Sequence, residues 1–468
     1  MALKIYNTLS RSVEPFKSIT PEKVGMYVCG VTVYDDCHIG HGRTFIAFDV
    51  ARRWLQESGY DVKFVRNVTD VDDKIIKRAA ERKILPSELA ETYTKRMQED
   101  LGELGCLPPS VEPRATQYIP KMLALIEKLE EKGYAYQDKN GDVDFSVRKF
   151  KPYGALSGKK VDELQPGERV RVEEAKQDPL DFALWKRAKP GEPEWDSKWG
   201  KGRPGWHIEC SVMAKRYLGD EIDIHAGGED LIFPHHENEI AQSEAANGVT
   251  FARYWMHNGF LNIDNKKMSK SLGNFFTVRE IGEKYDLQVL RFFMLSAHYR
   301  SPLNFSAELM EASKNGLDRI LTGVEKLKEL EEKAAAGTMS AAELENQKKA
   351  MELVEKYEAA MEDDFNTADA VSAVFELVKL SNSTASAEST GAYVGWMKET
   401  IERLCGVLGI ITEKKEEILD SEIEDMIAQR QAARKAKDFA LADQIRGKLL
   451  DMGIILEDTR EGVKWKRA

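Results

Sequence analysis

The sequence predicts an α/β protein: a Rossmann-like, doubly wound parallel sheet split by an insertion, followed by an α-helical bundle and a small C-terminal α/β domain. Three observations support this prediction. A strand–helix–strand pattern covers residues 24–67, a stretch rich in Pro, Gly and Trp at 189–205 interrupts the sheet pattern, and helical spacing dominates after Phe305. At 468 residues, the chain is long enough for about three domains.

The first strand–helix–strand unit has a glycine-rich turn. Val24–Cys29 is a short apolar strand, Thr44–Ser58 has apolar residues at helical spacing, and Val62–Val65 resumes a strand. The turn between the first strand and the helix contains three glycines, Gly30, Gly40 and Gly42. In such sheets a ligand binds at the carboxyl ends of the strands, so we expect a site at this turn.

The predicted insertion begins where the sequence pattern changes from that of a parallel sheet to an amphipathic helix followed by a hairpin. Ile119–Lys132 is an amphipathic helix, and Asp138–Gly141 is a hairpin turn between two short apolar runs. The sheet pattern resumes near Gly205, and Asp220–His225 is a further strand that Gly227 and Gly228 are expected to end.

The C-terminal part is predicted to be helical and then mixed. Apolar residues recur at helical spacing around 317–327 and 371–378, and polar breaks separate these helices. Two more helices, at 423–434 and 439–452, precede short strands that end near Trp465.

Composition excludes several classes of protein. Hydrophobic residues make up 42% of the chain and charged residues 31%, which is typical of globular proteins. No apolar run approaches the roughly 18 residues of a membrane span, and the N-terminus lacks a secretory signal, so we expect a cytoplasmic protein that does not enter the membrane. Five cysteines make no disulfide framework. The net charge of -11 argues against a nonspecific nucleic-acid binder, although a local basic surface remains compatible with it.

Two short motifs are typical of phosphate binding. In His38-Ile39-Gly40-His41, imidazole N–H groups at a helix start can approach phosphate oxygens and stabilise charge that develops during displacement. The basic loop 267–271, Lys-Met-Ser-Lys-Ser, has ammonium groups that can close on pyrophosphate. Taken singly, these motifs are equally compatible with solvated turn histidines and an ordinary exposed loop.

Four potential metal ligands flank these motifs: Cys29, Cys210, His235 and Glu239. His235 and Glu239 stand at i and i+4, so they share a face if Pro234 opens a helix. Two thiolates, an imidazole and a carboxylate suit zinc, although an isolated cysteine is more often a small core residue. A thiolate-rich metal site beside phosphate-binding motifs indicates an enzyme that activates a sulfur-bearing substrate with ATP.

Together the motifs resemble the HIGH and KMSKS signatures of class I aminoacyl-tRNA synthetases, and their wider context resembles the cysteinyl-tRNA synthetases from end to end. The segments that carry the resemblance are 29–35, 67–74, 205–210 and 225–230. The resemblance implies a ligase that forms cysteinyl-adenylate from L-cysteine and ATP with Mg²⁺ and transfers cysteine to tRNA(Cys). It also implies one zinc ion per chain, held by the four ligands above, that selects the substrate thiolate. We expect a monomer.

The resemblance also implies roles for individual residues. His38, His41, Lys267 and Lys270 would be catalytic. The adenylate pocket would contain Gly30, Thr32, Thr44, Asn67, Thr69, Trp206, His225, Gly228, Glu229, Asp230, Ile263 and Lys270. His225 would face the amino-acid pocket near Trp206. Helix geometry, rather than the resemblance, predicts that His236 points away from the proposed ligand site and has a capping or supporting role. Residues near the anticodon would be Arg434, Phe439, Asp443 and Asp458; the family often has a bulkier tryptophan at the Phe439 position.

The implied domains follow the pattern of the chain. They are a first half of the Rossmann catalytic domain at 1–118, a connective insertion at 119–204, a second catalytic half at 205–255, a KMSKS and stem-contact region at 256–312, a helical bundle at 313–408 and an anticodon-binding domain at 409–468.

Two alternatives remain open from the sequence. A related ligase could make the same adenylate but give cysteine to a small amine, as in mycothiol biosynthesis; the helical region after Phe305 and the basic C-terminal segment 430–437 argue against it. A noncatalytic tRNA-binding relative would have no reason to keep both signatures.

Overall fold

The computed structural model describes residues 2–163, 175–268, 274–413, 420–436, 438–452, 454–459 and 462–467. The chain divides into two compact units, residues 1–412 and 413–468. Each unit is described by itself.

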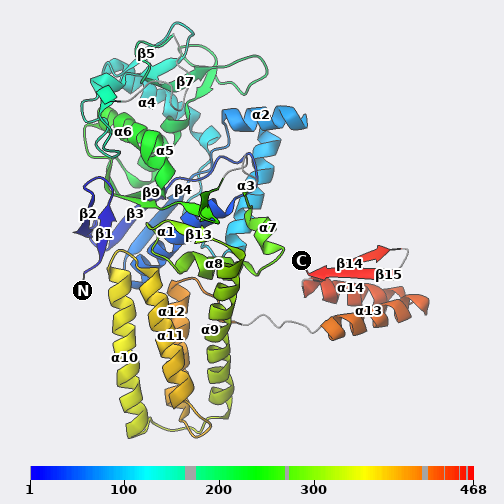
Figure 1. Ribbon diagram of the computed structural model, residues 1–468. Coiled ribbons are helices and arrows are strands. Elements are labelled where there is room, and N and C mark those ends of the chain that lie inside the picture. The colour runs from blue at the N-terminus through cyan, green and yellow to red at the C-terminus, as the bar shows by residue number, and fades with distance from the viewer. Residues whose placement is uncertain are drawn as a thin grey trace. The chain divides into compact units, whose positions relative to one another are not determined.

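A parallel sheet forms the centre of the first unit (Figure 1). Its four strands lie in the order β10–β9–β3–β4 and all run parallel. Their bounds are β3 (Lys23–Val28), β4 (Asp61–Arg66), β9 (Ile222–Gly228) and β10 (Ala252–Asn258). A short antiparallel pair, β1 (Lys4–Asn7) and β2 (Ser12–Pro15), precedes β3. The predicted parallel α/β sheet is therefore confirmed.

Strand β3 separates two hydrophobic cores because successive side chains point to opposite faces. Met26 and Val28 pack into one core with helix α1 (Ile39–Glu57). Tyr27 packs into the other, and Cys29, the residue after the strand, joins it there. Every residue of the central strand except Lys23 and Gly25 is thus buried, as the apolar run at 24–29 predicts.

Two boundaries differ from the sequence-based expectation. Helix α1 begins at Ile39 rather than Thr44, because His38 caps it, so Gly40 and His41 lie in its first turn. Strand β9 continues through Gly227 and Gly228, which pair with His257 and Asn258 of β10. Pairing to a neighbouring strand has overridden the weak strand propensity of glycine there.

The insertion lies at one end of this unit and packs on the Cys29 side of the sheet (Figure 1). It contains α4 (Ile119–Glu131) and a four-stranded antiparallel sheet in the order β5–β6–β7–β8. These strands are β5 (Ala135–Gln137), β6 (Val143–Phe145), β7 (Phe182–Arg187) and β8 (Gly202–Pro204). The hairpin predicted around Asp138–Gly141 is confirmed by the pairing of β5 with β6.

Helices after the insertion lead the chain back into the parallel sheet. Helix α5 (Trp206–Leu218) precedes β9, and α6 (Glu237–Asn247) precedes β10. Helices α2 (Asp73–Arg82) and α3 (Pro86–Glu103) follow β4.

A small three-stranded sheet, in the order β12–β11–β13, follows β10. Its strands are β11 (Leu261–Ile263), β12 (Lys266–Lys267) and β13 (Leu303–Phe305), and α7 (Val278–Gly282) and α8 (Leu287–Leu295) lie between β12 and β13 in the chain.

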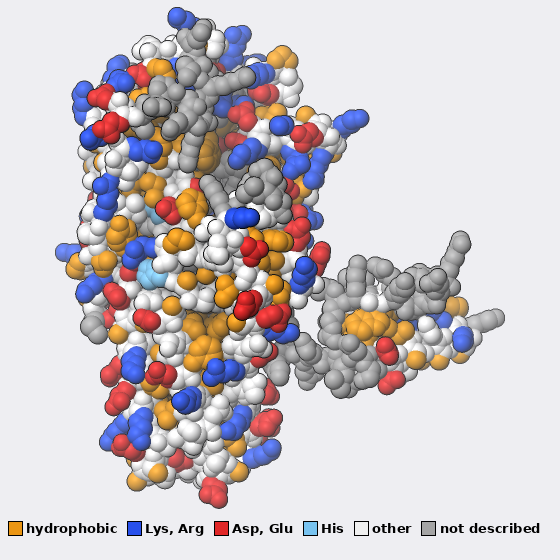
Figure 2. Space-filling view, in the orientation of Figure 1, with side chains coloured by type: hydrophobic (Ala, Val, Ile, Leu, Met, Phe, Trp, Pro, Cys, Tyr) orange, Lys and Arg blue, Asp and Glu red, His pale blue; other side chains and the backbone are white. Residues whose placement is uncertain are grey.

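Four long helices form a bundle at the other end of the unit (Figure 1). They are α9 (Ala307–Lys333), α10 (Ala341–Glu362), α11 (Thr367–Thr384) and α12 (Gly391–Val407). On the face shown in Figure 2, side chains of both charge signs are interspersed over this bundle rather than gathered by sign. Within the described residues, no helix combines the length and apolar character that crossing a membrane requires.

The second unit is a helical hairpin with a strand pair. It consists of α13 (Asp420–Lys435), α14 (Phe439–Asp451), β14 (Ile454–Thr459) and β15 (Gly462–Arg467). The two strands are antiparallel. Ile423, Ile445 and Leu449 contribute to a separate small core, so the two predicted helices and short strands are confirmed.

Candidate active site

The four predicted metal ligands meet at the carboxyl end of β3. Cys29 follows β3, Cys210 lies in α5, His235 lies in the turn 232–236, and Glu239 lies in α6. One ligand atom from each lies within 4.8 Å of the others, and all four residues are buried. The two sulfur atoms are 3.7 Å apart, and Cys29 Sγ is 3.5 Å from Glu239 Oε1. Zinc–sulfur bonds of about 2.3 Å in a tetrahedron put two sulfurs roughly 3.8 Å apart, so the donor set fits a zinc ion.

Local structure explains why these side chains converge. Cys29 points to the α5 and α6 side of the sheet because it alternates with Val28. Glu239 lies one helical turn after His235, and His235 Nε2 is 2.9 Å from Glu239 Oε1. The predicted i and i+4 relationship is therefore present, with the one-turn segment 232–236 leading into α6.

A second group with metal-ligand character overlaps the first. It consists of Cys29, His225, His236 and Glu239. His225 is fully buried, and its Nε2 lies 2.8 Å from Glu239 Oε2. Its ring stacks on that of Trp255, with the ring centroids 4.4 Å apart. Thus Glu239 offers one carboxylate oxygen to His235 and the other to His225.

His236 begins a chain of buried polar contacts behind Cys29. Its Nε2 lies 3.3 Å from Cys29 Sγ, and its Nδ1 lies 2.7 Å from His257 Nε2. His257 Nδ1 is in turn 2.8 Å from Thr8 Oγ1. Such contacts set the ring orientation and the tautomer of a histidine next to a metal ligand. His257 and Thr8 were missed by sequence reasoning because only the folded chain brings β1 and β10 beside this site.

Electrostatics favours ionisation of two of the four ligands, Cys210 and Glu239, whereas burial and the contact with Cys210 raise the pKa of Cys29 well above its usual value. Burial opposes ionisation of Cys210, but its contacts with Cys29 and His235 outweigh burial and lower its pKa to about 6. Burial also opposes ionisation of Glu239, yet His225 and His235 lower its pKa to about 2. A thiolate and a carboxylate at neutral pH are what a divalent cation requires.

The first turn of α1 contains the two motif histidines. His41 N donates to His38 Nδ1 at 3.2 Å, and His38 N donates to His41 Nδ1 at 3.4 Å. The two imidazole rings stack, with their centroids 3.4 Å apart. Because each Nδ1 accepts from a backbone N–H, the proton of each neutral ring resides on Nε2. Both residues are only partly buried. This arrangement offers two ring donors at a helix N-terminus, where anions bind well.

A second predicted cluster surrounds Gly30. Gly30 N donates to Asn67 Oδ1 at 2.9 Å, and Asn67 Nδ2 donates to Thr69 Oγ1 at 3.3 Å. A Cβ atom at Gly30 would lie 1.6 Å from the Asn67 carbonyl oxygen, so the close approach of these two segments requires glycine. Thr32 pairs with Thr69 through an isolated bridge.

The remaining predicted pocket residues lie on neighbouring elements. Trp206 begins α5, is 38% exposed, and stacks on His235 at 4.3 Å. A Cβ atom at Gly228 would lie 2.4 Å from Asp230 Oδ1 and 3.9 Å from Thr44 Oγ1, so these three residues converge. Glu229 and Asp230 are exposed, and Ile263 is buried in β11. Predicted pocket residues from β9, α1 and α5 therefore lie at the carboxyl edge of the sheet.

The second motif is described only in part. Lys267 lies in β12, while Lys270 lies outside the described residues. On the two sides of the undescribed segment, the Phe275 ring contacts the His38 ring at 5.3 Å, and a Cβ atom at Gly40 would lie 3.3 Å from the Met268 methyl carbon. Both flanks of this loop thus lie beside the first turn of α1.

Comparison with known proteins gives full-length matches. A family model described as the tRNA synthetases class I (C) catalytic domain covers residues 15–315. The cysteine–tRNA ligase of Lachnospira eligens is 57% identical over 100% of both chains, and that of Clostridioides difficile is 54% identical over 99% of this chain and 100% of its own. The chain belongs to the cysteine–tRNA ligase family. This membership makes it a ligase and a class I aminoacyl-tRNA synthetase, as the sequence resemblance implied.

Two further family models match the C-terminal parts of this cysteine–tRNA ligase family member. A DALR domain covers residues 356–412, and a cysteinyl-tRNA ligase anticodon binding domain covers residues 417–465. The first match falls within the helical bundle, and the second coincides with the separate unit 413–468.

Solved structures of other synthetases share the fold of this cysteine–tRNA ligase family member. A Mycobacterium tuberculosis methionyl-tRNA synthetase in complex with methionyl-adenylate has a TM-score of 0.59 at 15% identity, covering 82% of this chain and 89% of its own. A leucyl-tRNA synthetase ternary complex from Agrobacterium radiobacter has a TM-score of 0.62 at 11% identity, covering 84% and 85%. The class I catalytic architecture is therefore shown.

Proposed function

We propose that this enzyme activates L-cysteine with ATP, releases pyrophosphate, and transfers cysteine from the adenylate to the 3′-terminal ribose of tRNA(Cys). One observation carries the proposal: a thiolate-rich ligand set and a pair of histidines in the first turn of α1 flank the same strand-to-helix connection. Cys29 follows β3 and His38 caps α1, so one strand-to-helix connection serves both ends of an aminoacyl-adenylate. The ATP dependence belongs to the family as a whole.

We propose zinc as the resident metal, with Cys29, Cys210, His235 and Glu239 as its ligands. Bound there, zinc would supply a soft Lewis acid that accepts the thiolate of cysteine and discriminates against the hydroxyl of serine. The group that contains Cys210 is preferred over the overlapping group because it has two sulfur ligands and the low pKa of Cys210. His236 and His257 then orient Cys29 from behind.

We propose that the histidine pair stabilises the α-phosphate during adenylate formation. Nε2–H donors of His38 and His41 point away from the capped backbone, so they can donate to oxygens that gain charge in the transition state. Lys267 and Lys270 would stabilise the departing pyrophosphate, with Mg²⁺ accompanying ATP. Lys267 lies in β12, and its neighbour Met268 has its methyl carbon 3.3 Å from a Cβ atom built at Gly40, which supports this role.

The adenylate pocket is proposed from the two clusters at the sheet edge. Gly30, Asn67 and Thr69 form one hydrogen-bonded group, and Thr44, Gly228 and Asp230 form the other. Asp230 is an exposed carboxylate that can accept from ribose hydroxyls. Thr32, Trp206, His225, Glu229 and Ile263 complete the proposed pocket; His225 would act through Glu239, since it is buried against that carboxylate.

For the RNA partner, we propose that the unit 413–468 reads the anticodon. Phe439 is 61% exposed at the start of α14, which suits stacking on an unstacked base. Arg434 lies in the last turn of α13, Asp443 is exposed on α14, and Asp458 lies in β14. Phosphate contacts from the basic segment 430–437 would position the RNA.

We also propose the remaining organisation. The catalytic domain consists of 1–118 and 205–255, with the insertion 119–204 between its two halves. The stem-contact region is 256–312, the bundle is 313–408, and the anticodon-binding domain is 409–468. We propose that the enzyme acts as a monomer. Charging of tRNA and five unpaired, buried cysteines support a cytoplasmic location.

The decisive experiment is ATP–pyrophosphate exchange by purified enzyme with cysteine, serine or no amino acid, followed by charging of tRNA(Cys). We expect exchange with cysteine alone and transfer to tRNA. Transfer to an amino sugar instead of tRNA would favour the small-amine ligase, which the full-length match and the anticodon-binding module disfavour. Binding of tRNA without any exchange would favour a noncatalytic relative.

A further inference from the structure

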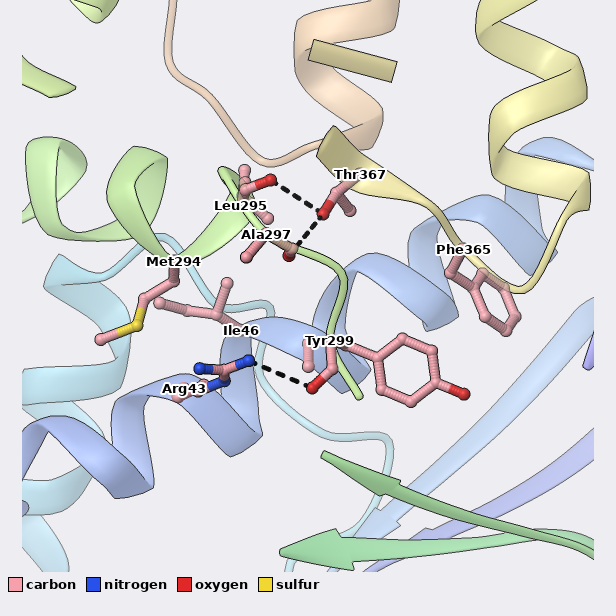
Figure 3. Close-up of a pocket in the computed structure, with 9 residues that line it drawn as sticks. Arg43, Ile46, Met294, Leu295, Ala297, Tyr299, Phe365 and Thr367 are labelled. Carbon is pink, nitrogen blue, oxygen red and sulfur yellow. Dashed lines mark hydrogen bonds between the residues drawn. The ribbon is translucent and has the colours of Figure 1, made fainter. Parts of the chain in front are cut away.

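Arg43 is a buried cation one turn into helix α1. It is 2% exposed, and the pocket that it lines is shown in Figure 3. Among the described residues, no carboxylate pairs with its guanidinium. Burial lowers the pKa of Arg43 to about 10, so it is still charged at neutral pH.

Backbone carbonyls, instead of a carboxylate, bind the two Nη atoms, while the buried Nε has no hydrogen-bond partner among the described residues. Arg43 Nη1 donates to the Phe260 carbonyl at 3.2 Å. Nη2 donates to the carbonyls of Tyr299 at 3.3 Å and His298 at 3.4 Å, and also to that of Ser301. The Tyr299 contact is drawn in Figure 3. A buried charge held by four carbonyls is costly to assemble, so each carbonyl must be placed accurately.

These carbonyls lie at the starts of two strands of the small sheet. Phe260 immediately precedes β11, and Ser301 precedes β13 by two residues. The strands pair in parallel, Leu261 with Leu303, and Leu303 N donates to the Phe260 carbonyl at 3.0 Å. Arg43 therefore joins helix α1 to both strands where their pairing begins.

The same sheet holds the backbone of Lys267. Asn262 of β11 pairs with Lys267 of β12, so the position of β11 sets the position of β12. Farther along the chain, Ile39 N donates to the Phe276 carbonyl at 3.1 Å, and His38 forms an isolated bridge with Thr277. The first turn of α1 is thus bonded directly to the segment that follows the second motif. Its link to the strand that leads into the motif runs through Arg43 and β11.

The side chains of Tyr299 and Arg300 are held by the turn between two helices of the bundle. Tyr299 Oη donates to Asp364 Oδ1 at 2.8 Å, and Arg300 Nε donates to Asp364 Oδ2 at 2.6 Å. Asp364 lies in the turn between α10 and α11 with φ of 58°, and its carboxylate also accepts from Tyr6 N at 2.8 Å. The segment 298–301 is therefore held between Arg43 and the bundle.

We propose that Arg43 is a positioning residue for adenylate formation: by binding the carbonyls before β11 and β13, it sets the strand that bears Lys267 against the helix turn that bears His38 and His41. The inference rests on the proposed roles of those three residues. Arg43 acts through them and does not contact the substrates. Losing it shifts the two phosphate-binding motifs relative to each other, and a misplacement of about 1 Å costs roughly 100-fold in rate.

The test compares Arg43→Met and Arg43→Lys with Arg291→Met in the full-length enzyme. Arg291 is a matched control because it is also fully buried and donates to backbone carbonyls, those of Leu104 and Leu408, and to Asp49 of α1. For each variant, the kcat and KM of cysteine-dependent ATP–pyrophosphate exchange are measured together with the melting temperature and the active fraction.

We expect Arg43→Met to lower kcat by about 100-fold per folded enzyme, with the KM for cysteine close to that of the parent enzyme. Cysteine binding is spared because Arg43 bonds to carbonyls of Phe260 and of the segment 298–301, and none of these residues belongs to the elements that bear the four proposed ligands. Arg43→Lys recovers part of kcat, because an ammonium group still donates but cannot span both strand starts. Arg291→Met lowers the melting temperature without the selective loss of kcat.

Gly259→Ala supplies a second approach that leaves the cation in place. A Cβ atom at Gly259 would lie 2.5 Å from the Arg300 carbonyl oxygen and 2.9 Å from the Ser301 carbonyl, so it displaces the segment that Arg43 binds. We expect the same selective loss of kcat, and this variant together with Arg43→Lys decides the question if Arg43→Met does not fold. Activities that fall only with the folded fraction, equally in the Arg43 and Arg291 variants, overturn the proposal. Absence of exchange in the parent enzyme would instead overturn the proposed function.

Discussion

Cys29 Sγ lies 3.7 Å from Cys210 Sγ, although 181 residues separate the two cysteines in the chain. The insertion lies between them in sequence, and the parallel sheet brings them together. Two sulfurs at this distance, with His235 and Glu239 beside them, are the physical basis for a sulfur-selective site.

Removing one of these sulfurs should remove the metal. We expect Cys210→Ala to lower zinc affinity by more than about 100-fold, because even the loss of a residue that supports a ligand costs about 10- to 100-fold. Elemental analysis of the purified protein measures zinc per chain independently of activity. Cys405→Ala is the control, since Cys405 is equally buried but belongs to the bundle core. Undiminished zinc in Cys210→Ala would contradict the proposed ligand set.

His38→Asn separates the catalytic role of His38 from its capping role. Asparagine is a good N-cap, so it replaces the contact between His38 Nδ1 and His41 N while removing the Nε2–H donor. We expect the kcat of ATP–pyrophosphate exchange to fall by about 100- to 1,000-fold with little change in melting temperature. Full exchange activity in this variant would show that His38 only caps the helix.

The insertion should lose stability as pH rises because of Asp144. This residue in β6 is fully buried, and neither carboxylate oxygen has a hydrogen-bond partner among the described residues. Burial raises its pKa from 3.8 to about 7. Since the folded form holds its proton more tightly, the contribution to stability is complete below about pH 4 and declines as pH rises toward 7.

Asp144→Asn should therefore be more stable than the parent at pH 8, by on the order of 1–4 kcal/mol, and equal to it near pH 4. Chemical denaturation at a series of pH values measures the difference. Asp162→Asn is the control, because the side chain of Asp162 is 90% exposed and should leave the pH dependence unchanged. A difference between Asp144→Asn and the parent that does not vary with pH would contradict this interpretation.

Phe439 should matter for RNA but not for adenylate formation. Stacking on a base contributes about 1–3 kcal/mol, so Phe439→Ala should raise the KM for tRNA(Cys) about 5- to 150-fold while leaving ATP–pyrophosphate exchange intact. Leu450→Ala is closely matched, because Leu450 lies on the same helix and is also 61% exposed. Equal effects of both substitutions on charging would argue against a specific stacking role.

Sequence patterns predicted the elements that depend on local spacing. The strand at 24–29, the hairpin at 138–141 and the two terminal helices follow from periodicity and turn chemistry, and each is present. The start of α1 was placed five residues too late, because the periodic apolar pattern begins after the cap. His38 as N-cap was the signal that could have corrected it, although histidine is not among the residues usually read as caps.

The sequence by itself determined which chemical groups are available: a histidine pair in a glycine-containing turn, two cysteines, and an i and i+4 histidine–glutamate pair. Tertiary structure alone decided their neighbours, such as His257 and Thr8 behind Cys29 and the carbonyls around Arg43. The physical reason is that long-range neighbours depend on strand order and packing. Backbone carbonyls are also the same in every residue, so no pattern of side chains can reveal which of them a buried cation binds.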